Sequence, residues 1–440
     1  MVLFNEENVP VISEYLPRVI DRQLTEYLCS SGAVLLSGPK WCGKTTTAEQ
    51  QAKSVLYMQD PDRTKGYLAT AESAPSVLLR GANPRLLDEW QMAPVLWDAV
   101  RHAVDRRDES GLFILTGSTT VDESLIMNSG TGRIARMVMY PMSLYESGDS
   151  NGEISLFDLF NDHQLDINGI TTDLTIDQLV FATCRGGWPS SLSKTTELAM
   201  LQEPQKYIDN ICSSDASTVD GIKRNPARVR AVLKAYARNI STLASDKSIL
   251  RDITSHFMDF TQPTLSSYVE ALERLYVIEN IPAWYPSIRS ATSIRTGKKK
   301  SFIDPSIAVA AYSLAPEALL FDLNTFGFMF ENLCVRDLKV YSSAIRGRIS
   351  YYNDRYGLEA DCVLHLDDGR YALIECKLGS SEIEKAASHL IDLKNLIKKA
   401  IVEERVKIRE PDMLIVLTGG EMAYTRKDGV KIIPIGTLKN

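Results

Sequence analysis

The segment that most constrains this chain is a short glycine-containing loop between an apolar run and a helix-compatible stretch. It matches the pattern G-x-x-x-x-G-K-[ST], in which backbone N–H groups surround a phosphate at a helix N-terminus. The apolar run 33–36 predicts a buried parallel strand, and residues 47–50 favour a helix. The sequence therefore predicts a P-loop that binds ATP. The predicted nucleotide-binding residues are Gly38, Pro39, Lys40, Trp41, Cys42, Gly43, Lys44, Thr45 and Thr46.

Two groups of this loop have predicted roles of their own, and two acidic residues further along complete the site. Lys44 is expected to contact the β- and γ-phosphates, and the Thr45 hydroxyl to ligate Mg²⁺. Asp88 and Glu89 follow the short apolar pair Leu86–Leu87. We expect Asp88 to hold Mg²⁺ through water and Glu89 to act as the base that polarises the attacking water.

A third apolar run, residues 112–115, predicts another strand of the same sheet. It ends at Thr116-Gly117-Ser118, where a parallel sheet presents its carboxyl edge to a ligand. Ser118 is the predicted sensor of the γ-phosphate. Arg133 and Arg136 follow, and either is a candidate to neutralise transition-state charge, within one chain or toward a neighbouring subunit. A surface location without a catalytic role is as good an interpretation for each arginine.

These motifs together resemble those of prokaryotic AAA-type ATPases with a C-terminal DUF4143 domain. The resemblance spans nearly the whole chain and implies an ATPase core with a helical lid, a winged-helix-like middle and a nuclease-like end. It does not imply an established substrate. The segments that carry it are the P-loop, Asp88-Glu89-Trp90-Gln91, residues 115–118, Gly132-Arg133, residues 140–146, Gly186-Gly187-Trp188-Pro189, Asp304-Pro305, Phe330-Glu331-Asn332, and the Glu-x-Asp and Glu-x-Lys pairs at 359–361 and 375–377.

Composition and charge limit the other possibilities. The 440 residues suffice for two or three domains, and the formal net charge of -7 restricts any contact with nucleic acid to a local basic patch. The seven cysteines form no C-x-x-C pair and the five histidines are isolated, which makes a zinc site unexpected and fits a reducing cytoplasm. No apolar run has the length of a membrane span, and the amino terminus lacks the basic start of a signal peptide.

The predicted fold class is α/β, with four segments along the chain. We expect a P-loop NTPase core of the AAA type at 1–150, a helical lid or linker at 151–222, a winged-helix-like domain with a basic hairpin at 223–300, and a restriction-endonuclease-like α/β domain at 301–440. Residues 153 to about 215 favour helix, with a sharp turn at Gly186–Pro189.

The middle segment predicts three helices followed by a hairpin. The helices are expected at 227–240, 246–260 and 265–275, and the strands at 276–278 and 281–284. The third helix is a poor complement to phosphate because it carries Glu270 and Glu273 against Arg274, which favours a structural role. A basic cluster lies just downstream, and it is either a phosphate-contacting wing or a solvated hairpin. Its members are Arg289, Arg295, Lys298, Lys299 and Lys300.

The carboxy-terminal third holds a second group of chemically informative residues. Residues 358–364 and 371–377 predict two strands joined by a turn at 367–370. Strand alternation places Glu375 and Lys377 on one face, which Asp361 shares across the ladder. This pattern resembles a PD-(D/E)xK nuclease core, in which Asp361 and Glu375 bind metal, Lys377 acts on water and Glu331 completes the site. The alternatives are an ion-paired strand pair or a nuclease fold that no longer cuts.

Two functions remain open from sequence. In the first, an ATP-hydrolysing protein acts on nucleic acid through a Mg²⁺-dependent nuclease-like site. In the second, a nucleotide-dependent switch or scaffold binds DNA or a protein partner without cleavage. Intact Asp361, Glu375 and Lys377 favour the first function, whereas the acidic overall charge favours the second. A homo-oligomer is expected if Arg133 or Arg136 acts on a neighbouring subunit.

Overall fold

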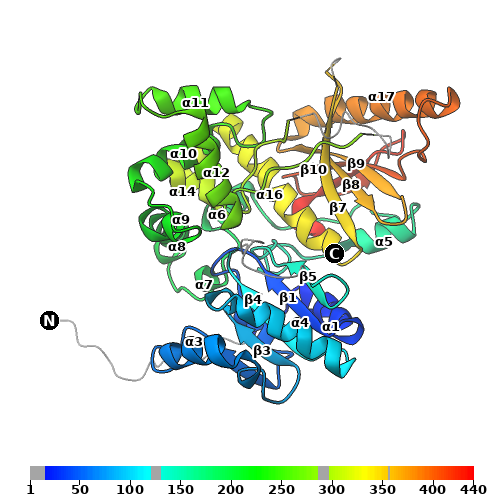
Figure 1. Cartoon of the computed structure of the whole chain (residues 1–440). Helices are drawn as coiled ribbons and strands as arrows, with labels where there is room; N and C mark the ends of the chain where they lie inside the picture. Colours follow the sequence, from blue (N-terminus) through cyan, green and yellow to red (C-terminus); the bar gives the residue numbers. More distant parts are fainter. Residues whose placement is uncertain (1–14, 120–129, 286–296, 355–356) are drawn as a thin grey trace, which may run out of the picture.

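The computed structural model describes residues 15–119, 130–285, 297–354 and 357–440 and arranges them in three regions (Figure 1). A parallel sheet with its helices lies at the bottom of the view, a group of helices lies at upper left, and a second sheet lies at upper right. Among the described residues, none of the helices has the length and apolar character that crossing a membrane requires.

The first region is built on a five-stranded parallel sheet in the order β2-β3-β4-β1-β5. Its strands are β1 (Ala33–Ser37), β2 (Ser54–Tyr57), β3 (Arg85–Asp88), β4 (Phe113–Gly117) and β5 (Ile134–Val138). Apolar residues of α1 (Ile20–Ser30) and α2 (Lys44–Glu49) pack on one face, and those of α3 (Thr64–Ser73) and α4 (Val95–Arg107) pack on the other. The strands predicted at 33–36 and 112–115 are confirmed, whereas β2 was not predicted.

The second region consists of helices and extends from Ile176 to the start of a long helix, α16 (Leu323–Ser343). A single apolar core joins these helices to one another and to the third region. They are α6 (Ile176–Arg185), α7 (Pro189–Leu192), α8 (Glu197–Asn210), α9 (Ala216–Thr218), α10 (Pro226–Arg238), α11 (Asp246–Thr254), α12 (Gln262–Arg274), α14 (Ser306–Tyr312) and α15 (Pro316–Phe321).

Two details of this region differ from the sequence prediction. The predicted helix at 246–260 ends at Thr254. The predicted strands after α12 appear in the described residues only as isolated bridges, Ile278 with Phe302, Ile281 with Lys299 and Ala283 with Tyr351. Three helices and a pair of bridged segments are therefore present, but a winged helix remains a prediction.

The third region is a six-stranded sheet in the order β11-β12-β10-β9-β8-β7. Its strands are β7 (Gly347–Asn353), β8 (Glu359–Leu366), β9 (Tyr371–Lys377), β10 (Met413–Thr418), β11 (Tyr424–Thr425) and β12 (Lys431–Pro434). The apolar side chains of α16 pack on one face and those of α17 (Ile383–Val402) on the other. The predicted hairpin between β8 and β9 is confirmed.

The segment between the first sheet and α6 belongs structurally with the third region. Here β6 (Ile154–Ser155) pairs with β13 (Leu438–Lys439) near the carboxyl terminus, α5 (Leu156–Asn161) follows, and Thr171 bridges to Met422. The prediction of helix throughout 153–215 is wrong for 162–175. The side chains of Asp162 and Asp166 accept hydrogen bonds from backbone N–H groups two residues on, and such local bonds compete with helix formation.

Candidate nucleotide site and carboxylate cluster

The P-loop turns tightly between β1 and α2, and its two glycines explain why. Gly38 has φ +147, and a Cβ there would lie 2.2 Å from the Met139 carbonyl oxygen. Gly43 has φ +100, a left-handed conformation that favours glycine, and it directly precedes α2. Lys44 is buried, and its ammonium donates to the Pro39 carbonyl at 2.7 Å. The loop therefore surrounds the Lys44 ammonium, which could exchange its hydrogen bond to Pro39 for a contact with a bound phosphate.

The two predicted metal-binding side chains of this region lie in direct contact. Thr45 on α2 donates its hydroxyl hydrogen to Asp88 at the end of β3, at 2.6 Å, and Thr116 donates to the same carboxylate oxygen at 2.7 Å. A hydroxyl and a carboxylate oxygen at a P-loop are ligands that Mg²⁺ accepts. The chemistry of this pair therefore fits the predicted cation.

Glu89 and Ser118 also meet, as neighbours at the carboxyl ends of β3 and β4. Ser118 donates its hydroxyl hydrogen to Glu89 Oε2 at 3.1 Å, and Gln91 donates a second hydrogen bond to the same oxygen. Glu89 itself has φ +54, a conformation that non-glycine residues seldom adopt. The predicted base and the predicted sensor are thus brought together, and Gln91 is a partner that the sequence prediction did not identify.

A pocket of about 550 Å³ opens above the P-loop, and part of its wall comes from the helical region. Pro189 and Ser190 on α7 and Glu203 on α8 face the loop across this pocket. Two contacts fix the wall to the loop. Lys40 forms an ion pair with Asp215 at 2.8 Å, and the Trp41 ring lies edge-on to Tyr207 with centroids 5.6 Å apart. Periodicity could not locate these partners because they lie far from the loop in sequence.

An arginine ahead of α1 holds the back of the loop. Arg18 is buried and donates to the carbonyl oxygens of Cys42 and Tyr140, each at 2.8 Å, and its guanidinium pairs with Glu146 at 3.1 Å. Arg18 was not among the residues predicted from sequence for this site. The segment 140–146 was included in the resemblance, and its Glu146 was the available signal.

The two candidate arginine fingers lie away from the P-loop of their own chain. Arg133 directly precedes β5, beside Ala33 at the amino ends of the parallel strands, and it pairs with Asp105 of α4 at 2.6 Å. The Arg136 guanidinium lies over the Trp97 ring on α4, 5.1 Å from its centroid. The P-loop is at the opposite, carboxyl edge of this sheet. A role for either arginine at the nucleotide site of the same chain is therefore not supported by the geometry.

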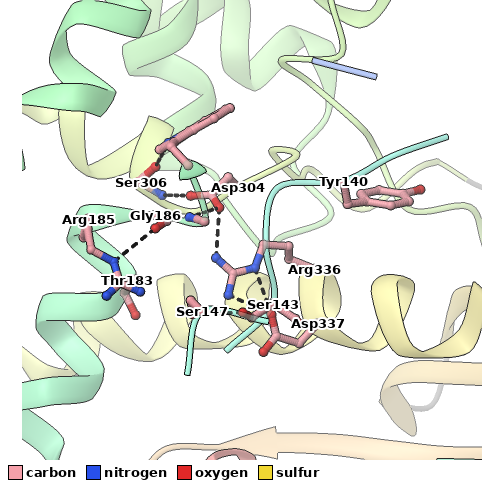
Figure 2. A network of polar contacts seen from close by, with 12 residues as sticks. Tyr140, Ser143, Ser147, Thr183, Arg185, Gly186, Asp304, Ser306, Arg336 and Asp337 are labelled. Carbon is pink, nitrogen blue, oxygen red and sulfur yellow. Dashed lines mark hydrogen bonds and ion pairs between the residues drawn. The ribbon is translucent and has the colours of Figure 1, made fainter. Parts of the chain in front are cut away.

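A buried polar network joins the three regions (Figure 2). Arg336 of α16 donates to Asp304 at 2.9 Å and to Asp337 at 2.8 Å, and all three side chains are at most 1 % exposed. Asp304 also accepts the Gly187 N–H at 3.0 Å, in the turn before α7, and Asp337 accepts the Leu144 N–H at 3.0 Å. The wall of the nucleotide pocket, the end of the first region and α16 thus share one ionic group.

This network predicts a specific pH dependence of stability. Burial raises the pKa of Asp337 to about 6, although the neighbouring Arg336 guanidinium favours the ionised carboxylate. A raised pKa in the folded state means that the stability contributed by Asp337 is fully present below its unfolded pKa of about 4 and is lost as the pH rises through 6. We expect Asp337→Asn to remove about 2 to 3 kcal/mol of this decline between pH 4 and 7. Urea unfolding at four pH values tests this, and parallel curves for the two proteins would contradict it.

The carboxy-terminal candidates converge in a second buried cluster. Asp361 on β8 lies opposite Glu375 on β9, because Cys362 pairs with Ile374 in the antiparallel register. Lys377 contacts Asp361 at 3.1 Å and Glu375 at 2.7 Å. Glu331 on α16 joins the group through Lys299, whose ammonium lies 2.5 Å from Glu331 and 3.1 Å from Asp361. The strand register predicted from sequence is confirmed, and Lys299 is a member that the prediction missed.

Two lysine ammonium groups lie among the carboxylates of this cluster. No three His, Cys, Asp or Glu side chains in the described ranges are arranged to hold a metal ion. Burial raises the pKa of Glu331 to about 7, and burial together with the Asp361 charge raises that of Glu375. Although burial alone would raise it, Lys299 and Lys377 hold the pKa of Asp361 below its usual range.

The predicted basic surface is smaller than expected, because two of its lysines are buried in ion pairs. Lys299 and Lys300 are buried, and Lys300 pairs with Asp246 at 2.8 Å, so neither ammonium is available to a phosphate. Lys298 is exposed. Arg289 and Arg295 lie outside the described residues.

Comparison with known protein families divides the chain into three segments. Residues 30–148 match the AAA domain, residues 176–318 match a domain of unknown function (DUF8612), and residues 326–438 match a domain of unknown function (DUF4143). The DUF8612 match crosses the predicted boundaries at 222 and 300, which remain predictions. No curated protein matches the chain significantly.

Two solved structures show distant similarity to the chain. The Walker-type ATPase PABY2304 of Pyrococcus abyssi is 13% identical over 66% of this chain and 94% of its own, with a TM-score of 0.41. A Drosophila ORC structure bound to DNA is 12% identical over 71% of this chain and 96% of its own, with a TM-score of 0.19. At these TM-scores neither similarity establishes a shared fold.

The AAA match and the geometry of the P-loop define the class of the first region. It is a P-loop ATPase domain of the AAA type. The chain combines this domain with a DUF4143 domain, and the DUF8612 segment lies between them.

Proposed function

We propose that ATP binds between the P-loop and the helical region, with each predicted residue in its expected role. Lys44 contacts the β- and γ-phosphates, Thr45 and Asp88 hold Mg²⁺, and Glu89 accepts the proton of the attacking water while Ser118 contacts the γ-phosphate. Bound Mg²⁺ would neutralise charge on the phosphates. The observation that carries this proposal is the pocket lined by both the P-loop and α7–α8.

A hollow beside the phosphate pocket could hold the adenine ring of ATP. It measures about 420 Å³, and its lining includes Tyr15, Thr46 and Thr47 on one side and Leu192 and Ser193 on the other. It also shares Gly43, Pro189 and Ser190 with the phosphate pocket. The two hollows together can accommodate a nucleoside triphosphate that contacts both regions. ATP would then tie α7 to the P-loop, and α7 is linked to α16 through Gly187, Asp304 and Arg336.

For the output of the ATP cycle, we favour a switch that binds DNA or a protein partner without cleavage. The specific observation is that lysine ammonium groups, rather than open coordination positions, separate the three carboxylates of the DUF4143 domain. Nuclease action is the second candidate, supported by the convergence of Asp361, Glu375 and Lys377. A Mg²⁺-dependent nuclease would require these carboxylates to lose their contacts with the lysine ammonium groups.

A cleavage assay separates these two candidates. Purified protein is incubated with supercoiled and single-stranded DNA, Mg²⁺ or Mn²⁺, and with or without ATP, beside Asp361→Ala. We expect no cleavage by either protein, and ATP hydrolysis that is alike in both because the two sites lie in separate domains. Metal-dependent cleavage that disappears in Asp361→Ala would instead establish the nuclease.

We also propose that the chain forms a homo-oligomer. Arg133 and Arg136 lie away from the P-loop of their own chain, so either could act as an arginine finger only at the nucleotide site of a neighbouring subunit. We expect ATPase activity per chain to rise with protein concentration as subunits associate. The rise should be lost in Arg136→Ala or Arg133→Ala if that residue reaches the neighbour's site. Constant specific activity from nanomolar to micromolar protein, with a monomeric mass throughout, would exclude an arginine finger in trans.

A further inference from the structure

The carboxylate cluster of the DUF4143 domain already contains a cation, and that cation belongs to another part of the chain. The Lys299 ammonium lies 2.5 Å from Glu331 Oε1 and 3.1 Å from Asp361 Oδ1. Its side chain is 9 % exposed, and those of Glu331 and Asp361 are 11 % and 6 % exposed. Carboxylate oxygens are ligands that divalent cations accept, and here two of them hold the Lys299 ammonium instead.

The backbone of Lys299 is held from outside the third region. It exchanges two hydrogen bonds with Ile281, at 2.9 and 3.0 Å, and the next residue, Lys300, exchanges two with Ser241 and Thr242 after α10, each at 2.8 Å. The Lys300 side chain points to Asp246 of α11 instead of the cluster. Asn332 of α16 anchors Ser301 by a further hydrogen bond at 3.0 Å. The helical region therefore sets where the Lys299 ammonium lies.

The charges of the cluster indicate which kind of ion could replace the Lys299 ammonium. When Glu331, Asp361 and Glu375 are all ionised, Lys299 and Lys377 leave the group with one excess negative charge. Both Glu375 oxygens are buried without a hydrogen bond of good geometry, although Lys377 lies 2.7 Å away. Without Lys299 the excess becomes two negative charges, which a divalent cation balances. Buried uncompensated charge is costly, so the cluster needs one cation or the other.

We propose that Lys299 is a built-in occupant of a divalent-cation site, so that the cluster binds either the Lys299 ammonium or a metal ion but not both. In the conformation described here the helical region keeps the ammonium in place and the cluster is closed to metal. The inference concerns cation binding alone and holds whether the partner of the chain is DNA or a protein.

Mn²⁺ binding to the full-length, nucleotide-free protein tests this proposal, by calorimetry and by the electron paramagnetic resonance signal of the ion. We expect Lys299→Met to gain one bound Mn²⁺ per chain relative to the wild type, and Lys299→Met with Asp361→Asn to lose it. Lys300→Met is the matched control, because it removes the neighbouring ammonium without touching the cluster, and it should gain none. Lys299→Gln provides a second, polar variant if the methionine variant fails to fold.

Two results would overturn the proposal. The first is a wild-type protein that already binds one Mn²⁺ which Asp361→Asn abolishes, because the ammonium would then not exclude the metal. The second is a folded Lys299→Met or Lys299→Gln protein, with native circular dichroism, that gains no Mn²⁺. Cleavage of DNA enters neither criterion, so failure here is distinct from failure of the proposed function.

Discussion

Glu89→Gln is expected to bind ATP as the wild type does and to hydrolyse it about 10²- to 10⁴-fold more slowly, the usual contribution of a general base. The amide is nearly the same size as the carboxylate and still accepts a hydrogen bond from Ser118, but it cannot take the proton of the attacking water. Asp88 and Thr45 are unchanged, so the groups that would hold Mg²⁺ remain. Steady-state phosphate release and ATP calorimetry on the same preparation measure the two quantities separately.

Two further variants make this result specific. Lys44→Ala should weaken ATP binding itself, because it removes the ammonium that contacts the phosphates. Glu49→Gln changes another acid of the same region, whose carboxylate accepts a hydrogen bond from Tyr57 on the protein surface, and it should leave both quantities unaltered. Equal hydrolysis by the wild type and Glu89→Gln would remove Glu89 from the catalytic assignment.

Arg336→Met is expected to cause the largest loss of stability of any single change in the buried network. The guanidinium is 1 % exposed and serves Asp304 and Asp337, both of which are 0 % exposed. Removing one partner of a buried ion pair leaves uncompensated charge and costs about 3–5 kcal/mol. The change should also loosen the link between α16 and the turn before α7, since Asp304 accepts the Gly187 N–H.

Urea unfolding of Arg336→Met measures the loss, with Arg348→Met as the comparison. Arg348 lies 3.7 Å from Asp367 with side chains 80 % and 57 % exposed, and such pairs contribute little to stability. A loss for Arg336→Met that is no greater than for Arg348→Met would show that the network is not a major source of stability. Retained stability with weakened ATP binding would instead assign it to the nucleotide site alone.

Local pattern predicted much of the fold because these features depend on near neighbours in sequence. The P-loop with its strand and helix, the acidic end of β3 and the polar end of β4 follow from motif spacing and the common carboxyl edge of a parallel sheet. The β8–β9 register follows from the turn at 367–370 and from alternation, which is why Asp361 meets Glu375 as predicted.

Contacts between distant segments account for most of what was missed. The partnership of Lys299 with Glu331 and Asp361 links residues 32 and 62 positions apart. Lys299 was assigned to a surface patch because its neighbours in sequence are basic, and only tertiary packing turns it inward. Similarly, alternation could not show that β13 returns to pair with β6, since both strands are only two residues long.

A structure of Glu89→Gln with ATP and Mg²⁺ tests most directly whether ATP binds between the P-loop and the helical region. We expect the triphosphate against residues 38–46, the Lys44 ammonium moved from the Pro39 carbonyl to the phosphates, and the base in the hollow beside Tyr15 and Leu192. Mg²⁺ should separate the Thr45 hydroxyl from Asp88, which now lie 2.6 Å apart. A triphosphate bound elsewhere, or a P-loop left empty at saturating ATP with Lys44 still on Pro39, would contradict the account.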